Sequence, residues 1–134
     1  MAEPIAPGKY ALSAAAHREP VIRAVPMPSD VNSNGDVFGG WVMSQMDIAG
    51  GILASQVTDG RVATVAVTAM TFNNPIRVGD VVSVYGEVVK TGTTSITVAL
   101  ETLVTRRKDP SVIRVTEGTF VYVAIGDDGR PRKL

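Results

Sequence analysis

Asp47 is the residue of this chain whose position most favours chemistry. It is the one charged residue between positions 40 and 57, a stretch of mainly apolar and small residues. A carboxylate in such surroundings is costly unless it is paired, hydrogen-bonded or partly hydrated. Two interpretations stay open: a structural aspartate bonded to a strand or a partner chain, and a general base or nucleophile in a sheltered cleft.

Two glycines, Gly39 and Gly40, stand where this stretch begins. They let a ligand approach the backbone, and the unpaired amides of a first helical turn can hold an anion or the oxyanion of a thioester under attack. The simpler interpretation is a tight entry from loop to helix. Asp36 is the rival carboxylate, although a turn aspartate explains it equally well. Asn32, in the same loop, could donate to a carbonyl.

The composition excludes several other kinds of chemistry. There is no cysteine, so disulfides, thiolate nucleophiles and cysteine metal sites are excluded, and the single histidine, His17, cannot form a histidine metal cluster. The 13 basic and 13 acidic residues balance, which disfavours a nucleic-acid partner. No secretory signal and no run of about 18 apolar residues is present, so we expect a cytoplasmic protein without a membrane partner.

The order of expected elements predicts an α+β fold. Residues 1–17 are expected to form a flexible arm and residues 18–134 a single domain. The one convincing helix, 40–57, is apolar or small on all sides and should therefore be buried and wrapped. Short links between the later strands favour antiparallel hairpins, which predicts a five-stranded antiparallel sheet around one long helix. The strands are expected at residues 20–27, 62–72, 81–90, 95–105 and 112–125.

Helix geometry also predicts an oligomer. Eight residues separate Gly39 from Asp47, which is about 12 Å along a helix, whereas reacting groups must meet within about 3–3.5 Å. If both residues serve one reaction, they must come from different subunits. We therefore expect a two-fold dimer with two sites at its interface.

Five runs of the sequence resemble the YciA-type acyl-CoA thioesterases of the hotdog superfamily: MPSDVNSNGDVFGGWVMSQMDIAGGILA, GRVATVAVTAMTF, PIRVGDVV, KTGTTS and FVYVAIGDDGRPR. The resemblance extends from about Val21 to Lys133. It implies a hotdog fold, dimers joined through their sheets, and further assembly as a trimer of dimers. It also implies hydrolysis of acyl-CoA to a free acid and CoA, without a metal or a cofactor.

The resemblance assigns roles to individual residues. Asp47 would activate water or attack the thioester directly, and the amide of Gly39 or Gly40 of the facing subunit would polarise the carbonyl. Asn32 matches an asparagine that some relatives place near the thioester. Relatives often carry a basic residue where this chain has Asn73 and Asn74, so phosphate contacts are expected elsewhere. The residues expected to contact substrate or CoA are Asp36, Phe38, Arg77, Lys90, Thr94, Ser95, Arg106 and Arg107.

Two alternatives compete with the hydrolase. A hotdog dehydratase typically pairs a histidine with a carboxylate, and the lone His17 lies outside the helix region. A non-catalytic acyl-CoA-binding module would be expected to lack an acid at position 47. The sequence favours the hydrolase over both.

Overall fold

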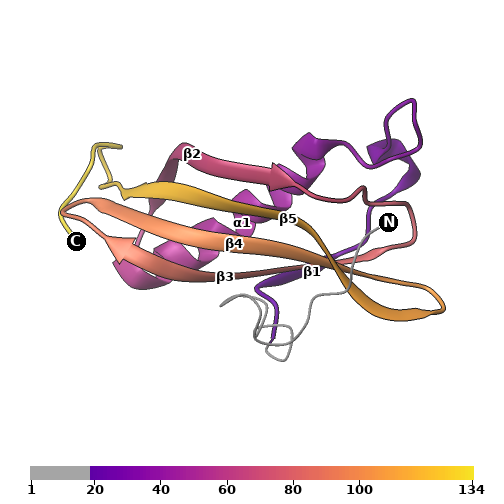
Figure 1. Cartoon of the computed structure of the whole chain (residues 1–134). Coiled ribbons are helices and arrows are strands. Elements are labelled where there is room, and N and C mark those ends of the chain that lie inside the picture. The colour runs from indigo at the N-terminus through magenta and orange to yellow at the C-terminus, as the bar shows by residue number, and fades with distance from the viewer. Residues whose placement is uncertain (1–18) are drawn as a thin grey trace.

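An antiparallel sheet curls around one long helix in this chain (Figure 1). The computed structural model describes residues 19–134, so the expected N-terminal arm and His17 lie outside the described residues. The five strands follow the order β1-β3-β4-β5-β2, and each neighbouring pair is antiparallel, which confirms the predicted fold class. The elements are β1 (Ile22–Ala24), the 3-10 turn η2 (Pro28–Asp30), α1 (Gly39–Thr58), β2 (Val62–Phe72), β3 (Val81–Thr91), β4 (Ser95–Arg106) and β5 (Asp109–Ala124).

Strand alternation places the core between sheet and helix. In β4, Ile96, Val98 and Leu100 are buried, whereas the residues between them are only partly covered. The same alternation in β5 buries Phe120 and Tyr122, as expected for a sheet with one face on the core. The described residues contain no helix that is long and apolar enough to span a membrane.

The first and last strands along the chain differ in length from the expected ones. The first strand is limited to Ile22–Ala24, because only these residues pair with β3. The last strand begins at Asp109 and not at Val112, because the β4–β5 ladder continues to the pair Arg106–Asp109 around a tight turn. Lys108 adopts a φ of 64° in that turn.

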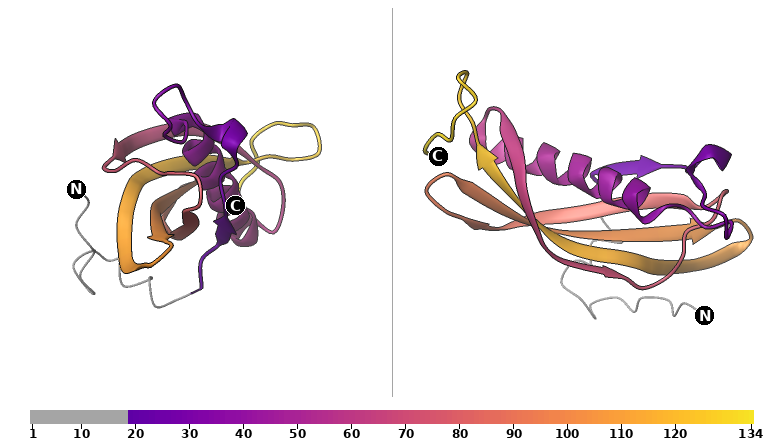
Figure 2. Two further views of the ribbon diagram at one scale, coloured as in Figure 1. Left: turned by 90° about the vertical axis from the view of Figure 1, so that its right-hand side faces the viewer. Right: turned by 90° about the horizontal axis from the view of Figure 1, so that it is seen from above.

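The helix is less enclosed than predicted. One face of α1 packs on the sheet, with Met46, Ala49 and Ala54 fully buried. On the other face Ile48 remains 53% and Ile52 38% exposed. The expected burial of the helix is therefore met on the face that packs against the sheet, whereas the opposite face of α1 stays partly exposed in a single chain (Figure 2).

Strand β2 forms one edge of the sheet. It pairs with β5 on one side, and its other edge has no neighbouring strand among residues 19–134. Val65 is 57% and Val67 39% exposed on this strand. A long apolar edge strand is a template for pairing with another chain, so this edge is suited to a second copy.

Candidate active site

The side chain of Asp47 lies where α1 meets β2 and β5. The hydroxyl of Thr64 on β2 donates to its Oδ1 over 2.6 Å. The hydroxyl of Tyr122 on β5 donates to the same Oδ1 over 3.1 Å and to the backbone oxygen of Asp47 over 2.9 Å. Oδ2 accepts no hydrogen bond from residues 19–134. The carboxylate is therefore held through one oxygen, and the other stays available for proton transfer or attack.

Tyr122 reaches this carboxylate from inside the core. The side chain is 1% exposed. Burial raises the pKa of Tyr122 far above its usual range, and the negative charge of Asp47 and the hydrogen bond to it raise this pKa further. The phenol consequently stays protonated and acts as a donor at any working pH.

The first turn of α1 offers a separate polar feature. Gly39 and Gly40 are exposed, and their amides donate to no acceptor in the described part of the chain. Phe38 precedes them as the N-cap and makes no side-chain cap hydrogen bond. Free amides at a helix start carry partial positive charge, so this turn can receive a carbonyl oxygen that gains negative charge.

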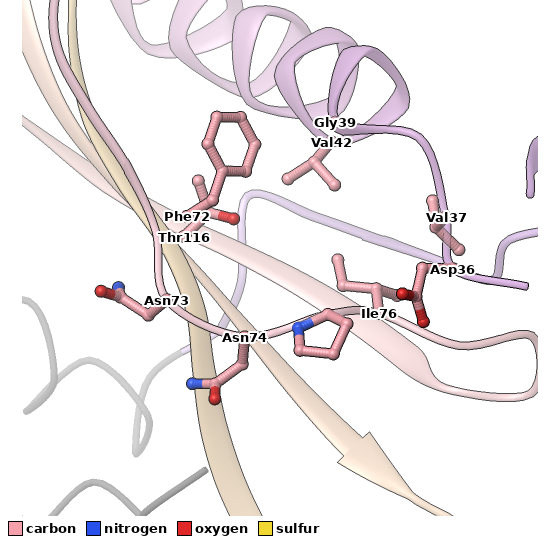
Figure 3. Close-up of a pocket in the computed structure, with 10 residues that line it drawn as sticks. Asp36, Val37, Gly39, Val42, Phe72, Asn73, Asn74, Ile76 and Thr116 are labelled. Atoms are coloured by element: carbon pink, nitrogen blue, oxygen red, sulfur yellow. The ribbon is translucent and has the colours of Figure 1, made fainter. Parts of the chain in front are cut away.

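A cavity of about 280 Å³ opens beside this turn (Figure 3). Asp36 and Gly39 line one side, and the segment after β2 lines the other. Most of its walls are apolar, but the buried Oγ1 of Thr116 has no hydrogen-bond partner among residues 19–134. The cavity can therefore accept a small, mainly apolar group close to the free amides. Its lining consists of Asp36, Val37, Gly39, Val42, Phe72, Asn73, Asn74, Pro75, Ile76 and Thr116.

Asn32 organises the loop that leads into α1. Its Oδ1 accepts hydrogen bonds from the backbone amides of Asn34 at 2.9 Å and of Asp36 at 3.2 Å. The backbone amide of Asn32 in turn donates to the backbone oxygen of Asp36. These bonds close an Asx turn of the kind that asparagine favours. Asn32 thus sets the position of Asp36 at the cavity wall.

Comparisons with known proteins agree with this geometry. Residues 34–108 match the family model of the thioesterase superfamily. The chain is 50% identical over 119 residues to the acyl-CoA thioester hydrolase YciA of Salmonella typhimurium, covering 87% of this chain and 90% of that protein. The YciA hydrolase of Escherichia coli is 48% identical over 117 residues, covering 85% of this chain and 89% of that protein. The chain belongs to the thioesterase superfamily.

Solved structures agree with this assignment. A hexameric thioesterase from Yersinia pestis superimposes with a TM-score of 0.82 at 51% identity, covering 87% of this chain and 94% of that one. A hexameric hotdog fold thioesterase of Campylobacter jejuni gives a TM-score of 0.82 at 38% identity, covering 87% and 90%. The hotdog fold and the YciA-type family expected from the sequence are both confirmed.

The structure separates the basic residues expected at the CoA phosphates. Lys90 lies near the end of β3, Thr94 lies in the turn that follows, and Ser95 is the first residue of β4. Arg77 precedes the other end of the same strand, whose eleven residues extend over about 33 Å. A single subunit therefore does not gather these side chains around one nucleotide.

The side chain of Arg106 makes an ion pair and a hydrogen bond within the fold of this thioesterase. Its Nε lies 3.2 Å from Oδ1 of the buried Asp80, and its Nη2 donates to the backbone oxygen of Pro75 over 2.9 Å. The amide of Arg77 also donates to Asp80. Arg107, by contrast, is exposed.

Sequence reasoning missed three residues at Asp47: Thr64, Tyr122 and Gly50. The last follows Asp47 by three positions, which places it on the same helix face. A Cβ built on Gly50 would lie 2.1 Å from the hydroxyl oxygen of Tyr122, so the glycine makes room for that phenol. The spacing from Asp47 to Gly50 was the only signal in the sequence.

Proposed function

We propose that this thioesterase hydrolyses acyl-CoA to a free carboxylic acid and CoA, with Asp47 as general base or nucleophile. The observation that carries the proposal is the arrangement of that carboxylate. It is the one charged group within α1, held through Oδ1 and open at Oδ2. This arrangement suits a group that must take a proton from water, or attack a carbonyl, in a partly sheltered place.

As a general base, Asp47 would remove a proton from a water molecule while its oxygen attacks the thioester carbonyl carbon. The carbonyl oxygen becomes an oxyanion, which an amide of the first helical turn stabilises. The C–S bond then breaks, the acid is released, and the CoA sulfur takes up the proton. As a nucleophile, the Asp47 carboxylate would attack the carbonyl carbon and the C–S bond would break, so that CoA leaves as a thiolate and takes up a proton. Water would then hydrolyse the resulting anhydride to the free acid and the Asp47 carboxylate. Neither route calls for a cofactor, and residues 19–134 contain no cluster of three or more metal-ligating side chains.

The oxyanion donor comes, in this proposal, from Gly39 or Gly40 of a facing subunit. Along α1, Gly39 lies about 12 Å and Gly40 about 10.5 Å from Asp47, too far for one thioester to meet the carboxylate and either amide of the same subunit. The uncovered edge of β2 and the exposed face of α1 support a partner at this place, because each leaves apolar side chains in solvent. We therefore propose a two-fold dimer with two sites, assembled as a trimer of dimers by analogy with the hexameric relatives.

The cavity at the helix start would receive the first carbons of the acyl chain. Its walls are mainly apolar and Gly39 lies on its rim. The exposed Lys90 and Arg107 remain candidates for the CoA phosphates, and the separation of the basic residues implies that more than one subunit contributes. We propose a cytoplasmic enzyme whose partners are its substrate and its own copies, without nucleic acid or membrane.

Thiol release from acyl-CoAs of two to sixteen acyl carbons tests this function. Wild type and Asp47→Asn are compared side by side, together with their oligomeric state and CoA binding. We expect turnover by the wild type and its loss in a folded Asp47→Asn enzyme that still binds CoA. No thiol release by the wild type would instead favour the non-catalytic acyl-CoA-binding module.

A further inference from the structure

Tyr122 makes a three-centre hydrogen bond to a single residue. Its hydroxyl lies 2.9 Å from the backbone oxygen of Asp47 and 3.1 Å from Oδ1 of the same residue. Because both acceptors belong to Asp47, the bond fixes the side chain relative to its own backbone. We infer that Tyr122 is a positioning residue, which holds Oδ1 of Asp47 so that Oδ2 is the oxygen that reacts. This inference rests on the proposed function.

The second hydroxyl on the carboxylate supports the same assignment of its two oxygens. Thr64 donates to Oδ1 over 2.6 Å, so both donors occupy one oxygen. Thr64 on β2 and Tyr122 on β5 are directly paired across these two neighbouring strands. Two donors on one oxygen leave the carboxylate little freedom to turn, and they leave Oδ2 without a hydrogen bond from residues 19–134.

Gly50 provides the space that this contact requires. A Cβ at Gly50 would lie 2.1 Å from the hydroxyl oxygen of Tyr122 and 2.8 Å from Cζ. At the next position, Gly51, a Cβ would approach the same ring only to 3.9 Å, an ordinary contact. The phenol thus sits against the helix backbone at one position, and an alanine there would displace it.

No other described charged group competes for Asp47. Strand β2 carries no charged residue, and α1 carries none besides Asp47. Strand alternation directs Glu87, Glu101 and Glu117 to the sheet face away from α1. Lys90 is exposed at the end of β3. The raised pKa of Tyr122 is consistent with its role, since the phenol remains a donor while Asp47 carries its charge.

The test is the pH dependence of kcat/KM for one acyl-CoA, measured for Tyr122→Phe and wild type. A donated hydrogen bond favours the ionised form of its acceptor, so the loss of this donor should move the acid limb of the profile to higher pH. We also expect kcat to fall by about tenfold with little change in KM. Tyr85→Phe removes a buried phenol hydroxyl from the other face of the sheet and should leave the acid limb in place.

A pair of glycine variants tests the same contact from the helix side. Gly50→Ala should reproduce the shifted acid limb, whereas Gly51→Ala should not, although both place an alanine in α1. If the profiles of Tyr122→Phe and wild type coincide while Asp47→Asn is inactive, the positioning role is overturned and the proposed function stands. If Asp47→Asn is as active as wild type, the catalytic role of Asp47 and the positioning role of Tyr122 both fail, while the hydrolase activity stands.

Discussion

The hydroxyl of Thr64 lies 2.6 Å from Oδ1 of Asp47 and joins the edge strand β2 to the middle of α1. The contact spans 17 residues of sequence and includes the turn at Asp59 and Gly60. Because of this hydrogen bond, a displacement of β2 would also displace the carboxylate of Asp47. This hydrogen bond therefore links the proposed assembly at that edge to the proposed chemistry at Asp47.

Thr64→Val keeps the shape of the side chain and removes the donor. We expect kcat to fall by about ten- to a hundredfold, because a hydrogen bond to a charged group contributes about 1.5–3 kcal/mol. Steady-state thiol release measures this change. Thr68→Val is the control on the same strand, since its hydroxyl donates to a backbone oxygen of β5. Equal losses in both variants would show that Thr64 acts through the strand and not through Asp47.

Arg106→Ala should destabilise the fold. Removal of the guanidinium leaves the buried carboxylate of Asp80 with the backbone amide of Arg77 as its remaining donor among residues 19–134. The loss of one partner of a buried pair costs about 3–5 kcal/mol. Urea unfolding at a fixed protein concentration measures the loss, with the exposed Arg107→Ala as control. An unchanged midpoint together with a raised KM for acyl-CoA would instead assign Arg106 to the CoA phosphates.

Because of Tyr122, the free energy of unfolding of this enzyme should fall at alkaline pH. Its pKa is raised in the fold, so the phenol is neutral there while the unfolded chain ionises near the ordinary value of 10. The contribution of the neutral phenol to the free energy of unfolding is complete below pH 10. As the pH rises above 10, this contribution falls by about 1.4 kcal/mol for each pH unit. Unfolding free energies at pH 9–11 should therefore fall more steeply for wild type than for Tyr122→Phe. Parallel curves would contradict this expectation.

Charge on the β2 edge should disrupt assembly. Val65→Lys places an ammonium group on the exposed edge strand, and we expect smaller particles by sedimentation and a matching loss of thiol release. Val89→Lys, at a side chain that is 52% exposed near the end of β3, is the control. An intact assembly in Val65→Lys would place the interface elsewhere.

The sequence was sufficient for the fold because its signals are local. Alternation in residues 95–105 and the apolar run of the helix each depend on neighbours in the chain, and Val62–Phe72 has the predicted bounds. The predicted burial of the helix is met on one face only, because one chain covers only one side of α1. The contact between Tyr122 and Asp47 could not be predicted, since 75 residues separate the two partners and only the register of β5 brings them together.

The candidate site was predicted only in part, because features that are local in the sequence can be recognised and contacts between distant residues cannot. Asp47 was identified by its lone charge in an apolar helix, which is a property of the sequence alone. Arg106 was expected to contact substrate or CoA because of its charge, and this contact stays a prediction. The charge of a guanidinium could not reveal its ion pair with the buried Asp80, 26 residues away. Basic residues on a surface are therefore poorly assigned without the fold.

The most direct test of the shared site is complementation between two inactive variants. Asp47→Asn lacks the carboxylate, and Gly40→Pro lacks one helix-start amide at a position where proline is tolerated and where a Cβ meets no atom within 4 Å. A Gly39→Pro enzyme serves in its place if Gly40→Pro stays active. In a random mixture of co-expressed subunits, half of the dimers are mixed and each mixed dimer has one complete site, so about a quarter of wild-type thiol release should return. Activity no higher than that of either variant alone, in mixed dimers verified by mass, would contradict a site built from two subunits.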